Sequence, residues 1–406
     1  MRDLAKVVSI KELLPIEGKD RIELATFNEN MYRVIVQKGF NPNDLCVFVE
    51  ADSLLPNDAK YDFLKARCFK ESLNRYLIKP MKMAGHISMG IVFDMSFLPK
   101  RKKPYKAGED VTDALGITKQ ELVEDASPKR VKYGLFHRIM WGNPLTRPIA
   151  KLVVKLAPKQ SNAFPTWLIP KSDETNLQDC SYVLEKFKHT KAYVTIKMEG
   201  QSATYLYQPL RKWCGKTIRM GRFTVCSRNN AYFDKKAMPH LFEMAERLGI
   251  AEKLKAYYDK TGVSLALQGE VCGPKIQKNI YDFTVNRFFV YKIRNLNTGK
   301  DLSYDELVKT TVWLNNSNQT ADCLRIVPLL KTGVLGGFGL ENYENAEKLC
   351  HNGFRLPFDE NPIVVTAGTK GSAYRLHEGV VVRGLNNEFS FKIKDAEYAF
   401  DFSGKD

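Results

Sequence analysis

The chain has 406 residues and a formal net charge of +16, from 62 Lys and Arg against 46 Asp and Glu. This length predicts two or three domains, and a hydrophobic content of 44% is enough for a sizeable core. No apolar run reaches the roughly 18 residues of a membrane helix, and residues 1–10 lack the apolar run of a signal peptide. We therefore expect an intracellular protein with no membrane partner.

The eight cysteines are scattered singly, form no CxxC pair and have no histidine cluster beside them. This pattern predicts no structural zinc and is typical of a reducing compartment.

The positive charge indicates a polyanionic partner, either nucleic acid or an anionic membrane surface. Residues 126–170 alone hold eight Lys or Arg and no Asp or Glu. Aromatic residues lie between these cations, which favours a polyanion with stackable bases. The alternative is a solvated basic linker. The candidate nucleic-acid contacts in this segment are Lys129, Arg130, Lys132 and Arg138.

The first part of the chain, residues 1–125, reads as short strands separated by turn residues. The expected strands cover residues 4–10, 21–27, 32–37 and 45–50. Regularly spaced short strands predict a small barrel or sandwich, and an OB-like β-barrel is the natural choice because that fold often binds nucleic acid. Several prolines interrupt residues 126–170, so this segment is expected to link two domains.

Residues 171–406 mix strands and helices without the regular alternation of a doubly wound sheet, which predicts an antiparallel α+β domain. Helices are expected over residues 238–259 and 304–314, and Ser303 with Glu306 forms a capping box for the second. The expected strands cover residues 192–197, 202–207, 264–270, 288–293, 379–383 and 389–394.

One of these strands ends in Lys197-Met198-Glu199-Gly200. A lysine beside an apolar wall loses its proton more easily than one in water, and it can then attack a phosphorus centre and form a covalent intermediate. Gly200 permits a tight turn and a close approach of backbone and substrate. Alone, this short motif matches many exposed strand-end lysines.

Further segments follow in a fixed order: Val225-Cys-Ser-Arg-Asn229, Gln268-Gly-Glu-Val-Cys-Gly-Pro274, Phe288-Phe-Val-Tyr-Lys-Ile293, Glu378-Gly-Val-Val-Val-Arg383 and Phe391-Lys-Ile-Lys394. With the Lys197 segment they resemble six motifs of the covalent nucleotidyltransferase superfamily, which contains DNA ligases, RNA ligases and mRNA capping enzymes. The resemblance covers residue 173 onwards and implies an antiparallel-sheet nucleotidyltransferase domain of the DNA/RNA ligase type, unrelated to ATP-grasp enzymes.

The resemblance also implies the chemistry. Lys197 would take AMP from ATP, pass it to a 5′-phosphate of RNA, and a 3′-OH would then expel it. Carboxylates of this motif set would hold Mg²⁺ or Mn²⁺ through its bound waters; they are Glu199, Glu270 and Glu378. The implied ATP and AMP contacts are Ile196, Lys197, Arg228, Glu270, Tyr291, Lys392 and Lys394, with Val380 or Val381 closing the other face of the base.

Only twelve residues follow Lys394, whereas DNA ligases and capping enzymes carry a further OB domain there. An N-terminal OB-type module followed by a nucleotidyltransferase domain resembles RNA ligase family 5. Its members seal 3′-OH/5′-phosphate nicks in duplexes, which implies a role in RNA repair. Two positions depart from that pattern: Asn176 stands where a basic residue is common, and Lys292 where an acidic one is. The alternatives are a DNA ligase, a capping-type guanylyltransferase, or a non-catalytic RNA-binding protein on a ligase scaffold.

Overall fold

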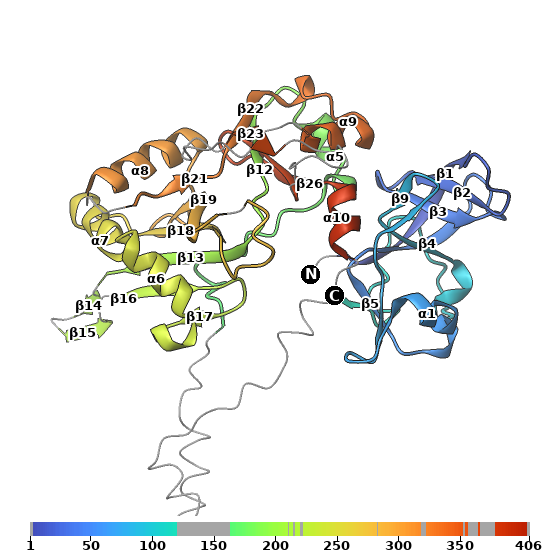
Figure 1. Cartoon of the computed structure of the whole chain (residues 1–406), viewed down its shortest axis with the longest axis horizontal. Helices are drawn as coiled ribbons and strands as arrows, with labels where there is room; N and C mark the ends of the chain where they lie inside the picture. Colours follow the sequence, from blue (N-terminus) through green and yellow to red (C-terminus); the bar gives the residue numbers. More distant parts are fainter. Residues whose placement is uncertain are drawn as a thin grey trace, which may run out of the picture.

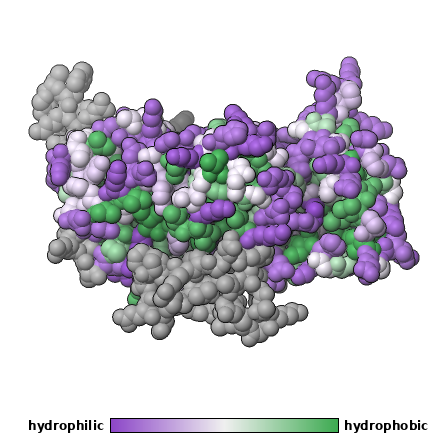
Figure 2. Space-filling view, turned by 90° about the horizontal axis from the view of Figure 1, so that it is seen from above, coloured by the Kyte–Doolittle hydropathy of each residue, from purple (hydrophilic) through white to green (hydrophobic). Residues whose placement is uncertain are grey.

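The structure is a computed structural model that describes residues 3–119, 163–209, 211–213, 216–219, 222–281, 283–317, 322–351, 354–355, 364–365 and 378–403. A smaller β-rich part lies beside a larger part of sheets and helices (Figure 1). On the face seen in Figure 2, hydrophobic residues show between hydrophilic ones on both parts. Among the described residues, no helix combines the length and the apolar character needed to cross a membrane.

The smaller part is a barrel of five strands in the order β10-β4-β1-β2-β3, in which each neighbouring pair is antiparallel. The backbone N–H of Ile35 on β3 donates to Ser88 Oγ, just before β10, so the barrel is nearly closed. A bulge after Ile10 lets the long first strand pair with β4 and then with β2. The strands are β1 Ala5–Pro15, β2 Ile22–Phe27, β3 Arg33–Gln37, β4 Leu45–Glu50 and β10 Gly90–Asp94.

Strand β4 is buried on both faces, which is unusual for a small barrel with solvent outside. Phe48 points to the barrel interior with Val8, while Val47 and Val49 pack outward against Tyr76 and its neighbours. The outward cover comes from the long connection between β4 and β10. It contains β5 Ser53–Pro56, η1 Ala59–Leu64, α1 Lys65–Cys68, β6 Phe69–Lys70, β7 Arg75–Leu77, β8 Met81–Met83 and β9 His86–Ser88. Strand β11 Thr118–Lys119 pairs with β5.

The larger part contains two sheets that are antiparallel apart from one short parallel pair, as the α+β pattern predicts. The first has the order β22-β12-β25-β26. Its strands are β12 Lys191–Ile196, β22 Leu329–Val334, β25 Gly379–Gly384 and β26 Ser390–Lys394. The second has the order β17-β16-β13-β18-β19-β20, with β21 beside β19. Its strands are β13 Gln201–Gln208, β16 Arg222–Cys226, β17 Ala231–Tyr232, β18 Leu265–Cys272, β19 Arg287–Asn295, β20 Lys300–Asp301 and β21 Arg325–Ile326. Two short hairpins complete the strands: β14 Arg211–Trp213 with β15 Lys216–Arg219, and β23 Phe354–Arg355 with β24 Val364–Val365.

Helices cover the second sheet on one face, and their apolar residues form one core with it. Ser303 and Glu306 form the predicted capping box, with mutual side-chain and backbone hydrogen bonds at the start of α8. The prediction of one helix over residues 238–259 is wrong, because Gly249 adopts φ +58° and breaks it into two. The helices of this part are α5 Tyr182–Lys186, α6 Pro239–Arg247, α7 Ile250–Thr261, α8 Tyr304–Ser317, α9 Tyr343–Lys348 and α10 Ala396–Ser403.

Helix α10 lies between the two parts (Figure 1), where Lys82 of the barrel pairs with Glu397 at 3.7 Å. On its other side Tyr398 packs against the apolar cluster that contains Ile196. The barrel also meets the larger part where the N–H of Met31 donates to the carbonyl of Gln178 at 3.1 Å. The barrel is therefore docked against the same part of the chain that holds the nucleophile strand.

Candidate active site

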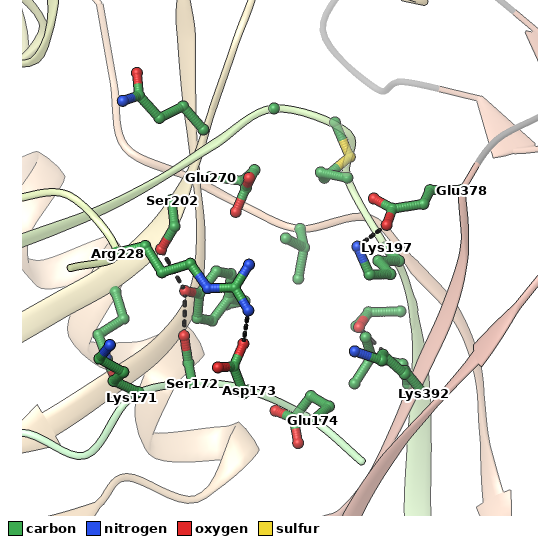
Figure 3. A pocket seen from close by; sticks show the side chains of 18 of the residues that line it. Lys171, Ser172, Asp173, Glu174, Lys197, Ser202, Arg228, Glu270, Glu378 and Lys392 are labelled. Carbon is green, nitrogen blue, oxygen red and sulfur yellow. Dashed lines mark hydrogen bonds and ion pairs between the residues drawn. The ribbon is translucent and has the colours of Figure 1, made fainter. Parts of the chain in front are cut away.

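A pocket of 320 Å³ lies between the two sheets of the larger part. Figure 3 shows Lys197, Glu378 and Lys392 on one wall and Arg228, Glu270 and Ser202 on the opposite wall. The structure brings most of the predicted nucleotide contacts into this lining. They are Ile196, Lys197, Arg228, Glu270, Tyr291, Glu378, Lys392 and Lys394.

Lys197 follows the last residue of β12, and its backbone N–H donates to the carbonyl of Gly379 on β25 at 2.9 Å. Thr195 and Lys197 lie two positions apart, so they share one face of this strand, and both line the pocket. Its ammonium forms an ion pair with the carboxylate of Glu378. The expected apolar wall is thus accompanied by a carboxylate that holds the lysine in place before a substrate arrives.

Gly200 is required for a different reason from the one the sequence suggests. A Cβ at this position would clash with the carbonyl oxygen of Val271 and lie 2.8 Å from the Sγ of Cys272. The absence of a side chain lets the β12–β13 connection pack directly on β18, which carries Glu270. A larger residue would push the nucleophile strand away from the opposite wall.

Lys392 and Lys394 both line the pocket, while Ile393 between them is fully buried in the core. The strand alternation predicted for this pair is therefore correct in the structure. Lys392 is anchored through its backbone N–H, which donates to the carbonyl of Thr175 at 2.8 Å. Lys394 lies 3.5 Å from the carboxylate of Asp52, a residue of the N-terminal barrel.

Three carboxylates interact electrostatically in this region: Glu270 and Glu378 line the pocket, whereas Glu199 lies outside its lining. Burial raises the pKa of Glu270 to about 8, with Lys197 opposing the shift and Glu378 adding to it. Burial also raises the pKa of Glu199. For Glu378 burial acts in the same direction, but the charge and hydrogen bond of Lys197 outweigh it and leave its pKa below the ordinary value.

These carboxylates fit a divalent cation held mainly through water. Among the described residues, Glu199 Oε2 is buried without a hydrogen-bond partner. The pKa values of Glu199 and Glu270 are both raised, so a nearby positive charge would stabilise their ionised forms. Within the described ranges, no three Asp, Glu, His or Cys side chains are grouped closely enough to hold a metal ion directly. Magnesium suits such a site, because it keeps several waters and binds through a few carboxylates plus phosphates.

The other end of the pocket contains Tyr291, whose hydroxyl lies 2.6 Å from Ser172 Oγ and 3.4 Å from Ser202 Oγ. Val381 lines this pocket, whereas Val380 is fully buried in the core behind the sheet. Of the two valines weighed for the base contact, Val381 lines the pocket and Val380 does not, because neighbouring residues of a strand point to opposite faces.

Sequence reasoning missed Gln268, which also lines the pocket and is 1% exposed. Its Nε2 donates to the carbonyl of Pro170 at 3.3 Å, while its Oε1 is buried with no partner among the described residues. Burying an acceptor that receives no hydrogen bond costs free energy, so Oε1 is suited to accept a hydrogen bond from a donor on a bound molecule. The signal was present in the motif segment, two residues before Glu270.

Asn176 does not line this pocket. Its Nδ2 donates to the hydroxyl of Tyr32 at 2.9 Å and to Glu50 Oε1 at 2.6 Å, and both partners belong to the barrel. Asn176, which stands where a basic residue is common, therefore forms a polar contact between the two parts. Lys292 is also turned away, and pairs with Asp301 at 3.5 Å.

The barrel itself contributes to the pocket lining through Asp52 and Lys119. No local sequence pattern indicated this, because the two residues are more than 70 positions from the motif residues they meet. The proposed nucleic-acid contacts Lys129, Arg130, Lys132 and Arg138 lie outside the described residues, as does most of the basic segment 126–170.

Comparison with protein families now adds to this geometry. The family model described as RNA ligase matches residues 190–394, which include Lys197, Glu270, Glu378 and Lys392. The chain belongs to the RNA ligase family. A second model, described as an OB-fold domain, matches residues 4–95 of this RNA ligase, in agreement with the barrel topology. Family membership places the protein among enzymes that ligate RNA.

Solved structures of Naegleria gruberi RNA ligase share the fold over nearly the whole chain. A variant with ATP and Mn has 23% identity and a TM-score of 0.71, with 98% of each chain covered. The form with PPi has 23% identity and a TM-score of 0.72, with 99% of each chain covered. No curated protein sequence matches the chain. The predicted order of an OB-like barrel followed by an antiparallel ligase-type domain is confirmed.

Proposed function

We propose that this RNA ligase is ATP-dependent and joins a 3′-OH to a 5′-phosphate through a lysyl-AMP and an RNA-adenylate intermediate. The observation that carries the proposal is the convergence of Lys197, Lys392 and Lys394 on one pocket with Glu270 and Glu378. Phosphoryl transfer depends mainly on positioning and charge stabilisation, and these residues supply both.

In the first step Lys197 leaves Glu378, loses a proton and attacks the α-phosphorus of ATP. A P–N bond forms while the bond to the pyrophosphate oxygen breaks, so pyrophosphate carries the electrons away. Lys392 and Lys394 lie on the face of β26 that lines the pocket, where their positive charges offset the negative charges of the phosphates.

In the second step a 5′-phosphate oxygen of RNA attacks the phosphorus of lysyl-AMP. The P–N bond breaks and Lys197 regains a proton, which regenerates the enzyme side chain. In the third step the 3′-OH attacks the 5′-phosphate, a phosphodiester forms and AMP leaves. Glu378 can then restore the ion pair with Lys197.

A divalent cation, Mg²⁺ or Mn²⁺, would supply positive charge to the phosphates and the leaving group. We assign its water-mediated binding to Glu199, Glu270 and Glu378. Two observations support this assignment: Glu199 Oε2 has no hydrogen-bond partner within the described part of the chain, and burial raises the pKa of Glu270 to about 8.

Gln268 is the candidate for adenine recognition. Its Oε1 would accept a hydrogen bond from the exocyclic amine of adenine, whereas guanine would present a carbonyl oxygen there and leave two acceptors face to face. Such a mismatch of buried polar groups discriminates more strongly than a difference in shape. Tyr291 and Val381, both in the lining, would bound the base.

The decisive experiment is incubation with divalent metal and ATP or GTP labelled at the α-phosphate, followed by detection of label on the denatured protein. We expect label from ATP that is lost in Lys197→Ala. Lys191→Ala is the matched control, because Lys191 lies at the exposed opposite end of the same strand. Label from GTP alone would favour a guanylyltransferase, and no label would refute the proposal.

We further propose a repair role in sealing nicked RNA, tested by comparing nicked RNA, nicked DNA and separate RNA ends as substrates. We propose a division into residues 1–125, 126–170 and 171–406, in which the basic middle segment contacts RNA phosphates. Neutral replacement of Lys129, Arg130, Lys132 and Arg138 should weaken RNA binding and lower its salt dependence. Lower adenylylation with unchanged RNA affinity would contradict that role.

A further inference from the structure

A second cavity, of 360 Å³, lies on the N-terminal barrel and has no part in the nucleotide pocket. It is formed by the long connection between β4 and β10, together with the start of β10 itself. We call it the barrel pocket. The lining residues used here are Phe63, Leu64, Arg67, Ile78, Lys79 and Ile91.

An exposed aromatic ring stands at its edge. Phe63 is 64% exposed, although a side chain of this size normally loses most of its surface on folding. Its ring meets those of Phe93 and Phe97 edge-on, with centroid separations of 6.3 and 6.2 Å. The ring is therefore held in place by its neighbours while much of its surface stays in solvent.

The apolar floor is bordered by positive charge. Arg67 and Lys79 both line the barrel pocket. Among the described residues that line this pocket, none is acidic. A fixed aromatic ring beside cations suits a base carried on a phosphate backbone.

The barrel pocket adjoins the nucleotide pocket through two backbone hydrogen bonds. The N–H of Asp52 donates to the carbonyl of Ile78 at 2.8 Å, and the N–H of Ile78 donates to the carbonyl of Ser53 at 2.9 Å. Ile78 lines the barrel pocket, and Asp52 lines the nucleotide pocket beside Lys394. A strand whose end lies at Lys394 could thus continue across this short bridge onto the barrel.

We propose that the barrel pocket binds an unpaired nucleotide of the RNA strand being joined, with its base on Phe63 and its phosphate near Arg67 and Lys79. The inference rests on the proposed ligase function and adds a preference, among nicked RNAs, for those with an unpaired nucleotide in the strand being joined. Bases inside a duplex are already stacked on both faces, so only an unpaired base can use Phe63. The connection between the fourth and fifth strands of an OB barrel is also well placed for contact with oligonucleotides.

The test uses the full-length protein and fluorescence anisotropy with short single-stranded RNA and with blunt RNA duplex. Phe63→Ala should weaken single-strand binding by about fivefold or more, while Phe63→Trp retains it. Tyr182→Ala is the control, because Tyr182 on α5 is an aromatic side chain of similar exposure, 67%. Duplex binding and lysine adenylylation by ATP should not change in Phe63→Ala.

A charge variant tests the cations independently. Joint Arg67→Gln and Lys79→Gln replacement should lower the slope of log affinity against log salt by about 1.4 for single strands. Lys255→Gln with Lys260→Gln on α7 removes the same charge from the far end of the molecule and should leave the slope unchanged (Figure 1).

Several results would overturn the inference. One is single-strand affinity in Phe63→Ala equal to that of the unmodified protein. Another is an equal fall in adenylylation, which would mean that the variant damages the fold. A third is loss of self-association in sedimentation with unchanged RNA affinity, which would make the pocket a contact between copies. If the unmodified protein takes no label from ATP, the ligase proposal fails. The RNA measurements still show whether the barrel pocket binds an unpaired nucleotide.

Discussion

The carboxylate of Asp52, on the turn after β4, lies 3.5 Å from the Nζ of Lys394 on β26. An acidic side chain of the barrel thus occupies the neighbourhood of a lysine assigned to the α-phosphate. Asp52 has φ +69°, a left-handed conformation that Asn tolerates as well as Asp. Asp52→Asn therefore removes the charge without straining the turn.

We expect Asp52→Asn to bind ATP up to about fivefold more tightly, because an exposed ion pair contributes about 0–1 kcal/mol and the phosphates no longer compete with the carboxylate. The measurement is calorimetric titration in a Lys197→Ala background, which prevents turnover. Asp3→Asn removes another exposed barrel carboxylate, paired with Lys6, and serves as control. Weaker ATP binding in Asp52→Asn would show that the barrel contact assists the nucleotide instead.

Gln268→Leu should reduce the preference for ATP over GTP, because the acceptor that distinguishes the two bases is removed. We expect the preference for ATP over GTP to fall by about 10-fold or more, because one buried hydrogen bond is lost. The readout is the ratio of lysine labelling rates with the two nucleotides. Thr204→Val removes a different polar atom of the same lining and is the control. An unchanged ratio would place the base elsewhere.

Glu270 should make stability depend on pH. Its folded pKa of about 8 exceeds the ordinary 4.5, because burial favours the neutral form. Between these values the folded chain holds a proton that the unfolded chain releases, so this group increasingly opposes folding as pH rises. Glu270→Gln should therefore gain stability relative to the unmodified protein at about pH 8.5 but not at about pH 4.5. Equal urea midpoint differences at both pH values would contradict a raised pKa.

Asn176→Ala should lower the free energy of unfolding by about 1–3 kcal/mol, because buried hydrogen bonds to Tyr32 and Glu50 are lost. Adenylylation at saturating ATP should change little once the protein is folded. Urea unfolding and the labelling assay measure the two effects separately. If labelling fell strongly with stability intact, Asn176 would act on a phosphate after all.

Gly200→Ala should destabilise the protein by about 1–3 kcal/mol and slow labelling of Lys197, because a Cβ meets the carbonyl of Val271. Gly337→Ala is the matched control, since a Cβ there has nothing within 4 Å. Circular dichroism melts and initial labelling rates report both effects. A Gly200→Ala protein with unchanged melting would show that the connection relaxes without cost.

The sequence predicted the pocket well because its chemistry is local. Lys392 and Lys394 share a face by alternation, and Lys197 shares one with Thr195 at the end of β12. What lay beyond prediction depends on contacts between distant segments. Neither the pairing of Asn176 with Tyr32 nor the arrival of Asp52 at Lys394 follows from any periodicity. Gly249 could equally have been tolerated within one helix, and only packing of α6 and α7 decides that it breaks the helix.

The strand that presents Lys197 lies in the middle of its sheet, and its partner β25 comes late in the chain. Thr195 and Val381, paired across these strands, are separated by 186 positions. The ribosome therefore synthesises Lys197 long before it synthesises β25 and β26. Until those strands are made, Lys197 lacks one wall of its pocket, its carboxylate partner and the two phosphate-binding lysines. Fragments that stop before residue 378 would contain the reactive lysine without a site, so incomplete chains would not consume ATP.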